Sequence, residues 1–326
     1  MKTVKILKGI AKEKVGIKTP LIVSIALTFH CNLKCRFCGI WKARRKEMTT
    51  EQVKKLIRDF SKNGMQLVIF TGGEPLLRKD IGELVDYAKS LGVYTHIVTN
   101  GNLIKNRIEE IKNVDSISVS IDGPKDINDL IRGKGSFEKA LEGIKTARRK
   151  GLFVHIMSSI WKGNVENNCY GIHKLLEISE NLGCKINFQP IYTDQYNLLK
   201  DKSYFPSKKE VLEALSLIED YKKRTNNIIA SQSYFEWIRD YDKKEMKCYA
   251  GRLFCYVFPD GLVVPCFFKE ELGVNGLEKG FMNAFNNMPE IKKCKCLCHG
   301  YSEYNLCFSL NIKSILNAAK QISGFI

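Results

Sequence analysis

Strand-like and helix-like segments alternate along residues 21–190, and this alternation constrains the fold more than any other feature of the sequence. Six short apolar or β-branched runs are separated by five segments with helical periodicity, and glycines close several of the helical segments. Units of this kind form a mostly parallel sheet with right-handed crossovers. The sequence therefore predicts an α/β fold, either an open doubly wound sheet or a partial (β/α) barrel, with its reactive site at the carboxyl ends of the strands. The strand-like runs are residues 21–29, 66–71, 94–99, 116–121, 153–160 and 185–189, and the helical segments are residues 49–63, 79–91, 103–111, 136–150 and 165–182.

Composition divides the chain into five parts. Residues 1–20 are a basic leader, and residues 21–193 hold the alternating pattern. Residues 194–247 are polar, Lys-rich and helical, which is typical of a connector. Residues 248–310 hold seven cysteines around a short hairpin pattern, and residues 311–326 place apolar side chains at helical spacing. We therefore expect a barrel domain, a helical connector, a small cysteine-rich α+β extension and a C-terminal amphipathic helix.

The sequence shows neither a secretory signal peptide nor a membrane span. The first 18 residues contain six lysines and no continuous apolar core. The longest apolar run, residues 21–29, is far shorter than the ~20 residues that cross a bilayer. We therefore expect a cytoplasmic protein, in which the twelve cysteines are metal ligands or redox groups rather than disulfides.

Three cysteines follow the first strand-like run in a single loop. Cys31, Cys35 and Cys38 have the spacing C-x3-C-x2-C. A structural zinc site uses four protein ligands, and the adjacent His30 could supply the fourth. Three cysteines alone can hold a cubane [4Fe–4S] cluster, with one iron left open to a substrate or cofactor. The spacing therefore leaves two alternatives, an iron–sulfur cluster or zinc.

Small polar residues stand at the ends of three further strand-like runs. The second run ends in Gly72-Gly73-Glu74-Pro75, the third in Thr-Asn-Gly at 99–101, and the fourth in Ser-Val-Ser-Ile-Asp-Gly at 118–123. Each motif alone would be an ordinary turn. Because the carboxyl ends of parallel strands meet at one edge of a sheet, the motifs together predict a shared site beside the cysteine loop.

Residues 21 to about 190 resemble the core of the radical S-adenosylmethionine (SAM) enzymes. The cysteine spacing, the aromatic residue before the last cysteine and the Gly-Gly-Glu-Pro motif carry the resemblance. It implies a partial (β/α)6 TIM-like barrel with a [4Fe–4S] cluster on Cys31, Cys35 and Cys38, whose open iron binds the amino and carboxylate groups of SAM. The contacts that the resemblance implies are Phe37 near the adenine, Gly72, Gly73 and Glu74 at the methionine amino group, Asn100, Ser120 and Asp122 at the ribose or carboxylate, and Arg132 at the carboxylate, with a surface turn residue as the alternative for Arg132.

The same resemblance implies the reaction. A reduced cluster cleaves SAM to methionine and a 5′-deoxyadenosyl radical, which removes a hydrogen atom from an unreactive carbon. The cofactor carries the difficult chemistry, and the protein orients the reactants. An electron donor such as ferredoxin or flavodoxin is the partner that this reaction implies. The sequence identifies no substrate-facing acid or base.

The cysteine-rich part resembles the SPASM extension of radical SAM enzymes, or its shorter twitch form. Cys248, Gly261 and Cys266 fit the first half of that pattern, and Pro-Asp-Gly at 259–261 predicts a hairpin turn. The second half departs from the family's C-x2-C-x5-C-x3-C, because this chain has C-x-C-x-C-x8-C. We therefore expect one or two auxiliary iron–sulfur clusters, with a zinc knuckle as the alternative. The candidate ligands are Cys248, Cys255, Cys266, Cys294, Cys296, Cys298 and Cys307.

Four further residues are interpreted as structural, and a fifth is a weaker candidate ligand. Cys169 and Cys184 stand alone in the sequence and are interpreted as small buried core residues. His155 and His173 are interpreted as packing or surface groups. His299, beside Cys298, is a less favoured iron ligand than the cysteines.

The substrate is less constrained than the cofactors. The net charge of +17 suggests a polyanionic partner, but no phosphate-binding loop, RNA-recognition motif or helix-turn-helix accompanies it, so nucleic acid is not expected. The two amphipathic termini leave peripheral membrane contact open. Auxiliary clusters in the resembled enzymes favour a peptide or protein side chain as substrate. The alternatives are a small metabolite, lipid or cofactor precursor and, in a different class, a non-catalytic metal-binding module that docks nucleic acid.

Overall fold

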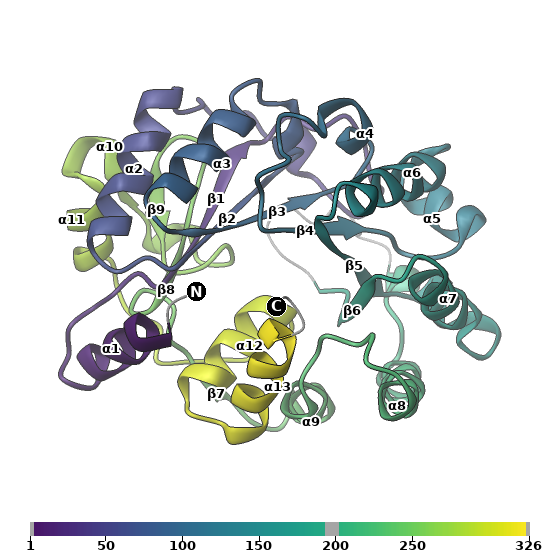
Figure 1. Cartoon of the computed structure of the whole chain (residues 1–326). Coiled ribbons are helices and arrows are strands. Elements are labelled where there is room, and N and C mark those ends of the chain that lie inside the picture. The colour runs from purple at the N-terminus through teal and green to yellow at the C-terminus, as the bar shows by residue number, and fades with distance from the viewer. Residues whose placement is uncertain (1–2, 193–201, 324–326) are drawn as a thin grey trace.

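The computed structural model describes residues 3–192 and 202–323. Its central element is a nine-stranded sheet with the order β10-β9-β8-β1-β2-β3-β4-β5-β6. Strands β1 to β6 are all parallel to their neighbours, and helices cover the outer side of the curved sheet (Figure 1). The predicted partial (β/α)6 barrel is therefore confirmed. Its strands are β1 Ile22–Thr28, β2 Leu67–Gly72, β3 Tyr94–Thr99, β4 Ser116–Ser120, β5 Phe153–Ile160 and β6 Lys185–Pro190.

The helices between these strands differ from the predicted ones at two places. The helix expected at 103–111 is reduced to the single turn α4 (Ile104–Arg107), and the helix α5 (Lys125–Arg132) is additional. The α5 helix escaped prediction because it buries Asn128 and Arg132 beside only one apolar residue, Ile131. The other barrel helices are α2 Thr50–Lys62, α3 Ile81–Ser90, α6 Ser136–Arg149 and α7 Lys162–Asn181.

The barrel strands turn one face to the helices and the other to the interior. On β5, Val154 and Ile156 belong to the main apolar core, while His155 and Met157 alternate with them and stay partly accessible. Because successive strand residues point to opposite faces, the same alternation on β3, β4 and β6 gives the interior a polar lining. We call this lining the inner wall: His96 on β3, Ser116 and Ser118 on β4, His155 and Met157 on β5, and Asn187 on β6.

The cysteine-rich region extends the barrel sheet. Strand β8 (Phe254–Val257) pairs in parallel with β1, opposite the side that holds β2, and Ile22 faces Phe254 in this register. Strand β9 (Leu262–Val264) pairs antiparallel with β8, and β10 (Val274–Asn275) pairs with β9. The predicted hairpin turn at 259–261 is present between β8 and β9, where Gly261 has a φ of 82°. The extension therefore shares one sheet with the barrel.

Arg45 ties this hairpin to the segment that follows the cysteine loop. Its guanidinium donates to Asp260 Oδ2 at 2.7 Å and also bonds Glu270. The same group lies over the Phe258 ring, 4.3 Å from the ring centroid. The first cysteine loop and the β8–β9 hairpin are therefore held together by charge and by aromatic packing.

Helices from the C-terminal part lie across the opening of the curved sheet (Figure 1). Here Phe308 packs with Ile22 and Phe254 in a second apolar cluster, and the Tyr301 ring stacks on Phe254 at 5.4 Å.

In the described part of the chain, no helix is long and apolar enough to cross a membrane. The boundary expected at residues 193–194 lies outside the described residues. The remaining elements are α1 Thr3–Lys14, η1 Ile40–Lys42, η2 Pro75–Leu77, η3 Lys202–Tyr204, α8 Lys208–Arg224, α9 Gln232–Asp240, β7 Met246–Lys247, η4 Glu270–Leu272, α10 Gly276–Lys279, α11 Phe281–Asn287, β11 Lys293–Cys294, α12 His299–Phe308 and α13 Ile312–Ser323.

Candidate cofactor site

The first cysteine loop follows β1 and is held against the ends of β2 and β3. The backbone N–H of Gly73 donates to the Thr28 carbonyl at 2.7 Å, and that of Glu74 donates to the His30 carbonyl at 2.8 Å. A Cβ on Gly73 would lie 2.3 Å from the His30 carbonyl oxygen, and one on Gly72, at a φ of 132°, would lie 2.2 Å from that of Thr28. Both glycines are therefore required by the approach of two backbones, in addition to any ligand contact.

Glu74 lies fully buried between the ends of β2 and β3. Its carboxylate accepts hydrogen bonds from Thr99 Oγ1 at 2.8 Å, the Asn100 N–H at 2.9 Å and the Leu76 N–H at 3.0 Å. Burial raises the pKa of this carboxyl to about 7, even though all three donors favour the charged form. Through these hydrogen bonds, Glu74 holds the end of β2 against the end of β3.

Asn100 connects the end of β3 to the cysteine loop. Its Nδ2 donates to Asn32 Oδ1 at 2.7 Å and lies 3.8 Å from Cys31 Sγ. The Leu33 N–H also approaches Cys31 Sγ, at 3.4 Å. Ser120 lies partly accessible at the end of β4. The end of β3 therefore supplies a hydrogen-bond donor to the first of the three sulfurs.

Asp122 and Arg132 form a buried ion pair behind the other two cysteines. Arg132 Nε and Nη2 both lie 2.7 Å from Asp122 Oδ2, while Asp122 Oδ1 accepts from the Ser159 N–H at 2.8 Å. Asp122 is 1% exposed and Arg132 is 9% exposed. The guanidinium also interacts electrostatically with Cys35 and Cys38. Arg132 is therefore a buried residue of the site, and the surface-turn alternative is wrong.

These surroundings fit a thiolate-bound cluster on the three cysteines. A guanidinium, an amide and a backbone N–H face the sulfurs, and each stabilises negative charge on sulfur. Without a metal, burial raises the pKa of the Cys31 thiol to about 11. The Phe37 ring lies 5.6 Å from the Arg132 guanidinium, at the rim of the loop. The His30 side chain is 65% exposed and lies 3.8 Å from Glu47, so it is not placed beside the sulfurs as a fourth ligand.

A second group of cysteines gathers below the extension hairpin. Cys248 interacts with Cys294, Cys266 interacts electrostatically with Cys248 and Cys298, and Cys296 interacts with Cys248, Cys266 and Cys298. Within the described residues, no three His, Cys, Asp or Glu side chains converge tightly enough to hold a single metal ion. The contacts given above therefore bring five cysteines, Cys248, Cys266, Cys294, Cys296 and Cys298, close enough to interact.

Two predicted ligands lie apart from this group. Cys255 is 1% exposed and points from β8 into the main core with Val257 and Val263, on the face of the sheet opposite Phe254. Cys307 lies near the end of α12, where Glu303 is the charged group that affects its thiol. The structure therefore brings together five of the seven candidate auxiliary cysteines.

The five-cysteine group is held by buried polar contacts to the barrel and to α9. Trp237 Nε1 donates to the Cys296 carbonyl at 2.7 Å, and the His299 N–H donates to Gln189 Oε1 on β6 at 3.1 Å. His299 Nε2 lies 3.5 Å from Glu303 Oε1 but has no hydrogen-bond partner within residues 3–192 and 202–323. The extension cysteines are thereby fixed relative to the barrel interior.

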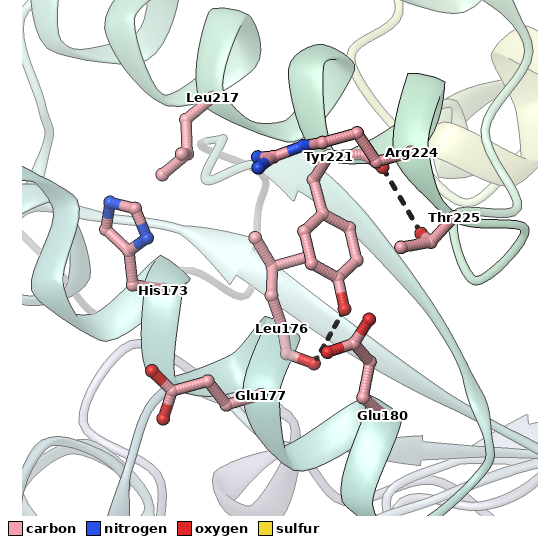
Figure 2. A pocket seen from close by; sticks show the side chains of 8 residues that line it. All are labelled: His173, Leu176, Glu177, Glu180, Leu217, Tyr221, Arg224 and Thr225. Atoms are coloured by element: carbon pink, nitrogen blue, oxygen red, sulfur yellow. Dashed lines mark hydrogen bonds between the residues drawn. The ribbon is translucent and has the colours of Figure 1, made fainter.

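Two residues of the interior were not predicted from the sequence to belong to the site. His96 and His155 lie on the inner wall, where each bonds Ser118, and the packing interpretation given to His155 overlooked this polar setting. The signal that could have found them is the alternation of serines and histidines with apolar residues along β3, β4 and β5. His173 instead lies on the outer surface, in a groove of about 430 Å³ between α7 and α8 (Figure 2). That groove includes no residue from a strand end.

Comparisons with known proteins place this geometry in a family. Residues 25–175 match the model of the radical SAM superfamily. Over 87% of this chain and 89% of the relative, the sequence is 28% identical to "AdoMet-dependent heme synthase" of Methanosarcina barkeri. It is 38% identical to "Fe-coproporphyrin III synthase" of the same organism, over 46% of this chain and 39% of that relative.

Solved structures show the same fold at low sequence identity. Streptococcus suis SuiB bound to S-adenosylmethionine superposes with a TM-score of 0.70 at 19% identity, covering 86% of this chain and 68% of that one. The enzyme anSMEcpe with bound AdoMet superposes with a TM-score of 0.63 at 19% identity, covering 82% and 78%. The expected cofactors, SAM and a [4Fe–4S] cluster, are those of this family. Residues 25–175 therefore form a radical SAM domain, and the protein is an enzyme with radical SAM chemistry.

Proposed function

We propose that the enzyme acts on an iron-containing tetrapyrrole, a cofactor precursor, rather than on the peptide side chain that the sequence analysis favoured. The observation that carries this proposal is the end-to-end alignment with a relative named as a heme synthase. The likeness to peptide-modifying enzymes rests on shared fold at about one-fifth identity and does not carry a substrate. The polar inner wall and the neighbouring His299 together hold three buried atoms without a hydrogen-bond partner among the described residues, which is consistent with a ligand that carries acidic side groups.

The cysteine loop is the proposed cofactor site. Cys31, Cys35 and Cys38 would hold the [4Fe–4S] cluster, and the bound cluster and SAM together supply the one-electron chemistry that activates an unreactive C–H bond. The chain contributes position and charge. Asn100 and Arg132 stabilise the negative sulfurs, and the buried Asp122 keeps the guanidinium in place.

The ends of β2, β3 and β4 form the proposed SAM-binding edge. Gly72 and Gly73 expose backbone beside the cysteine loop, because neither carries a side chain that would cover it. Glu74 fixes the relative position of the first two strand ends and can receive the methionine ammonium group of SAM. Phe37 and Ser120 are the proposed contacts to adenine and ribose.

The five gathered cysteines hold one auxiliary cluster in this proposal. A [4Fe–4S] cluster takes four cysteines, and the group of Cys248, Cys266, Cys294, Cys296 and Cys298 can supply them with one to spare. Cys255 and Cys307 are then structural residues. Their replacement by Ala is expected to leave the iron content at the value for two clusters. Replacing Cys248 and Cys296 together leaves only three of the five cysteines and is expected to lower the iron content, with the Cys255→Ala and Cys307→Ala double variant as the matched control.

The electron donor is proposed to be a small acidic protein of the ferredoxin or flavodoxin type. The net charge of +17 favours encounter with a negatively charged partner at low ionic strength. Reduction rates with such a donor should therefore fall as salt is added, while reduction by dithionite should not follow this dependence.

The test of the proposed function is anaerobic turnover with Fe-coproporphyrin III. The enzyme, reconstituted with iron and sulfide, is mixed with dithionite, SAM and the porphyrin, and the products are followed by mass spectrometry. The proposal predicts 5′-deoxyadenosine together with a mass change in the porphyrin. A variant with Cys31, Cys35 and Cys38 replaced by Ala should form neither, and Cys184→Ala, another buried cysteine, should form both. 5′-Deoxyadenosine with an unchanged porphyrin would reject the tetrapyrrole substrate and reopen the peptide alternative.

A further inference from the structure

A continuous line of hydrogen bonds crosses the inner wall from β3 to β5. Ser116 Oγ lies 2.7 Å from His96 Nδ1, His96 Nε2 lies 2.8 Å from Ser118 Oγ, and Ser118 Oγ lies 2.5 Å from His155 Nε2. The two imidazole rings stack, with centroids 5.5 Å apart and an angle of 11° between their planes. The line therefore engages both nitrogens of His96 and one nitrogen of His155.

Both imidazole rings of this line are neutral near pH 7. Burial lowers the pKa of His96 to about 4, and burial, with His96 and His299 nearby, lowers the pKa of His155 well below its ordinary value. A neutral imidazole carries one ring proton, and a serine hydroxyl carries one proton. If Ser118 donates to one ring and accepts from the other, one ring must be protonated on Nε2 and the other on Nδ1.

Each end of this hydrogen-bonded line reaches a group that can exchange a proton with its surroundings. At the amino end of the strands, the hydroxyl of Tyr94 lies close enough to Ser116 to interact with it, and Tyr94 is partly exposed. At the interior end, His155 Nδ1 is buried without a hydrogen-bond partner among the described residues. Two more such atoms, Asn187 Oδ1 and His299 Nε2, belong to residues that are 1% and 8% exposed. Buried polar atoms are rarely left unsatisfied, so this interior end is suited to a polar ligand.

We propose that Tyr94, Ser116, His96, Ser118 and His155 form a proton relay between the amino end of the barrel and its interior, where His155 exchanges a proton with a carboxylic acid group of the substrate. The choice of a carboxylic acid rests on the proposed function, because coproporphyrins carry propionic acid side chains. The relay itself does not depend on that choice. A carboxylic acid that enters a buried interior favours its neutral form, so its ionisation there requires a positioned proton acceptor.

Each member of the relay receives one proton and gives one away. The proton of the acid moves to His155 Nδ1, while the proton on His155 Nε2 passes to Ser118 and that of Ser118 passes to His96 Nε2. The proton on His96 Nδ1 then passes to Ser116, whose own proton leaves through Tyr94 to water. The result is a carboxylate inside the barrel and a proton in solvent. No electron moves, and the reverse sequence resets the relay.

The first test measures the ring tautomers of the holoenzyme by 15N NMR. The chain has five histidines, so 15N-histidine labelling and His→Gln variants assign every ring. The relay predicts that His96 and His155 are both neutral and carry their protons on unlike nitrogens. The opposite finding, both rings protonated on Nε2, would show that Ser118 only accepts from each, and it would overturn the relay. An imidazolium at either position would overturn it as well.

The second test breaks the relay far from the substrate. Tyr94→Phe removes one hydroxyl at the amino end of β3, and Tyr87→Phe, on α3, is the matched control. Turnover of Fe-coproporphyrin III should fall about tenfold in Tyr94→Phe, less than the about 10²–10⁴-fold that a positioned acid–base group contributes, because water can partly replace the hydroxyl. The solvent deuterium isotope effect on turnover should change with it.

The two tests separate the relay from the proposed substrate. Equal turnover and equal isotope effects in Tyr94→Phe, Tyr87→Phe and the unaltered enzyme would overturn proton exchange with the substrate. If the unaltered enzyme does not convert Fe-coproporphyrin III, the proposed function fails instead, and the carboxylic acid assignment fails with it. In that case the ring tautomers of His96 and His155 alone decide whether the relay exists.

Discussion

The ion pair between Asp122 and Arg132 makes a quantitative prediction about the cofactor site. Arg132→Met removes a guanidinium that makes two 2.7 Å contacts to Asp122 Oδ2. The carboxylate is 1% exposed and keeps the Ser159 N–H as its remaining donor, at 2.8 Å. Removing one partner of a buried pair costs about 3–5 kcal/mol, mostly because an uncompensated charge stays buried. We therefore expect Arg132→Met to lose about 3–5 kcal/mol of unfolding free energy.

A second substitution tests whether the buried charge causes this loss. In the double variant Asp122→Asn with Arg132→Met, the amide oxygen of Asn can still accept from the Ser159 N–H, and no charge is left unpaired. The double variant should therefore recover at least about 2 kcal/mol relative to Arg132→Met alone. Arg58→Met on the exposed face of α2 is the control and should stay within about 0.5 kcal/mol of the unaltered protein.

The assay is urea unfolding of the reconstituted enzyme under anaerobic conditions, followed by circular dichroism. Because Arg132 also faces Cys35 and Cys38, its removal should shift the reduction potential of the bound cluster to a more negative value. A loss below about 1 kcal/mol in Arg132→Met would refute the reasoning. So would a double variant that is no more stable than the single one.

Two further predictions concern stability. Arg45→Ala should cost about 2–4 kcal/mol of unfolding free energy, since it removes the ion pairs to two part-buried carboxylates and the packing on Phe258, whereas Arg44→Ala, an exposed neighbour, should change the urea midpoint little. Burial raises the pKa of Glu74 from 4.5 to about 7, so the folded chain keeps a proton that the unfolded chain releases. Stability should therefore fall by about 1.5 kcal/mol between pH 5.5 and 7, and Glu74→Gln should remove this slope. A flat profile for the unaltered enzyme would contradict the pKa of Glu74.

The barrel strands could be predicted because their signal is local. Each of the six runs is apolar on the face that meets the helices, and all six appear close to their expected bounds. The helix α5 could not be predicted in the same way. Its buried Asn128 is stabilised by accepting from the Asp122 N–H and by donating to Ser136, contacts that depend on the folded arrangement. Local periodicity cannot reveal a helix whose buried face is polar.

The cysteine loop and the strand ends of the candidate site could be predicted from the sequence. The contacts that hold the loop and the strand ends in place could not. Spacing indicated that Cys31, Cys35 and Cys38 share a loop. That Glu74 connects two strand ends by hydrogen bonds follows only from the positions of those strands. In the extension, the sequence did not reveal that Cys255 lies apart from the other cysteines. The hairpin made Cys255 a candidate ligand together with Cys266, but Cys255 alternates with Phe254 on β8, and this alternation turns its thiol into the main core. Proximity in sequence does not decide which face of a strand a side chain takes.

The position of β1 between β2 and β8 has a consequence for how the protein is made. Ile22 pairs with Leu67 on one side and with Phe254 on the other. During synthesis, β1 can pair early with β2, but its second edge stays open until most of the chain has left the ribosome. Open strand edges invite pairing with other chains, and contacts between distant residues slow folding. A nascent chain that ends before β8 should therefore depend on chaperones, and full-length protein should be recovered more readily at low expression temperature.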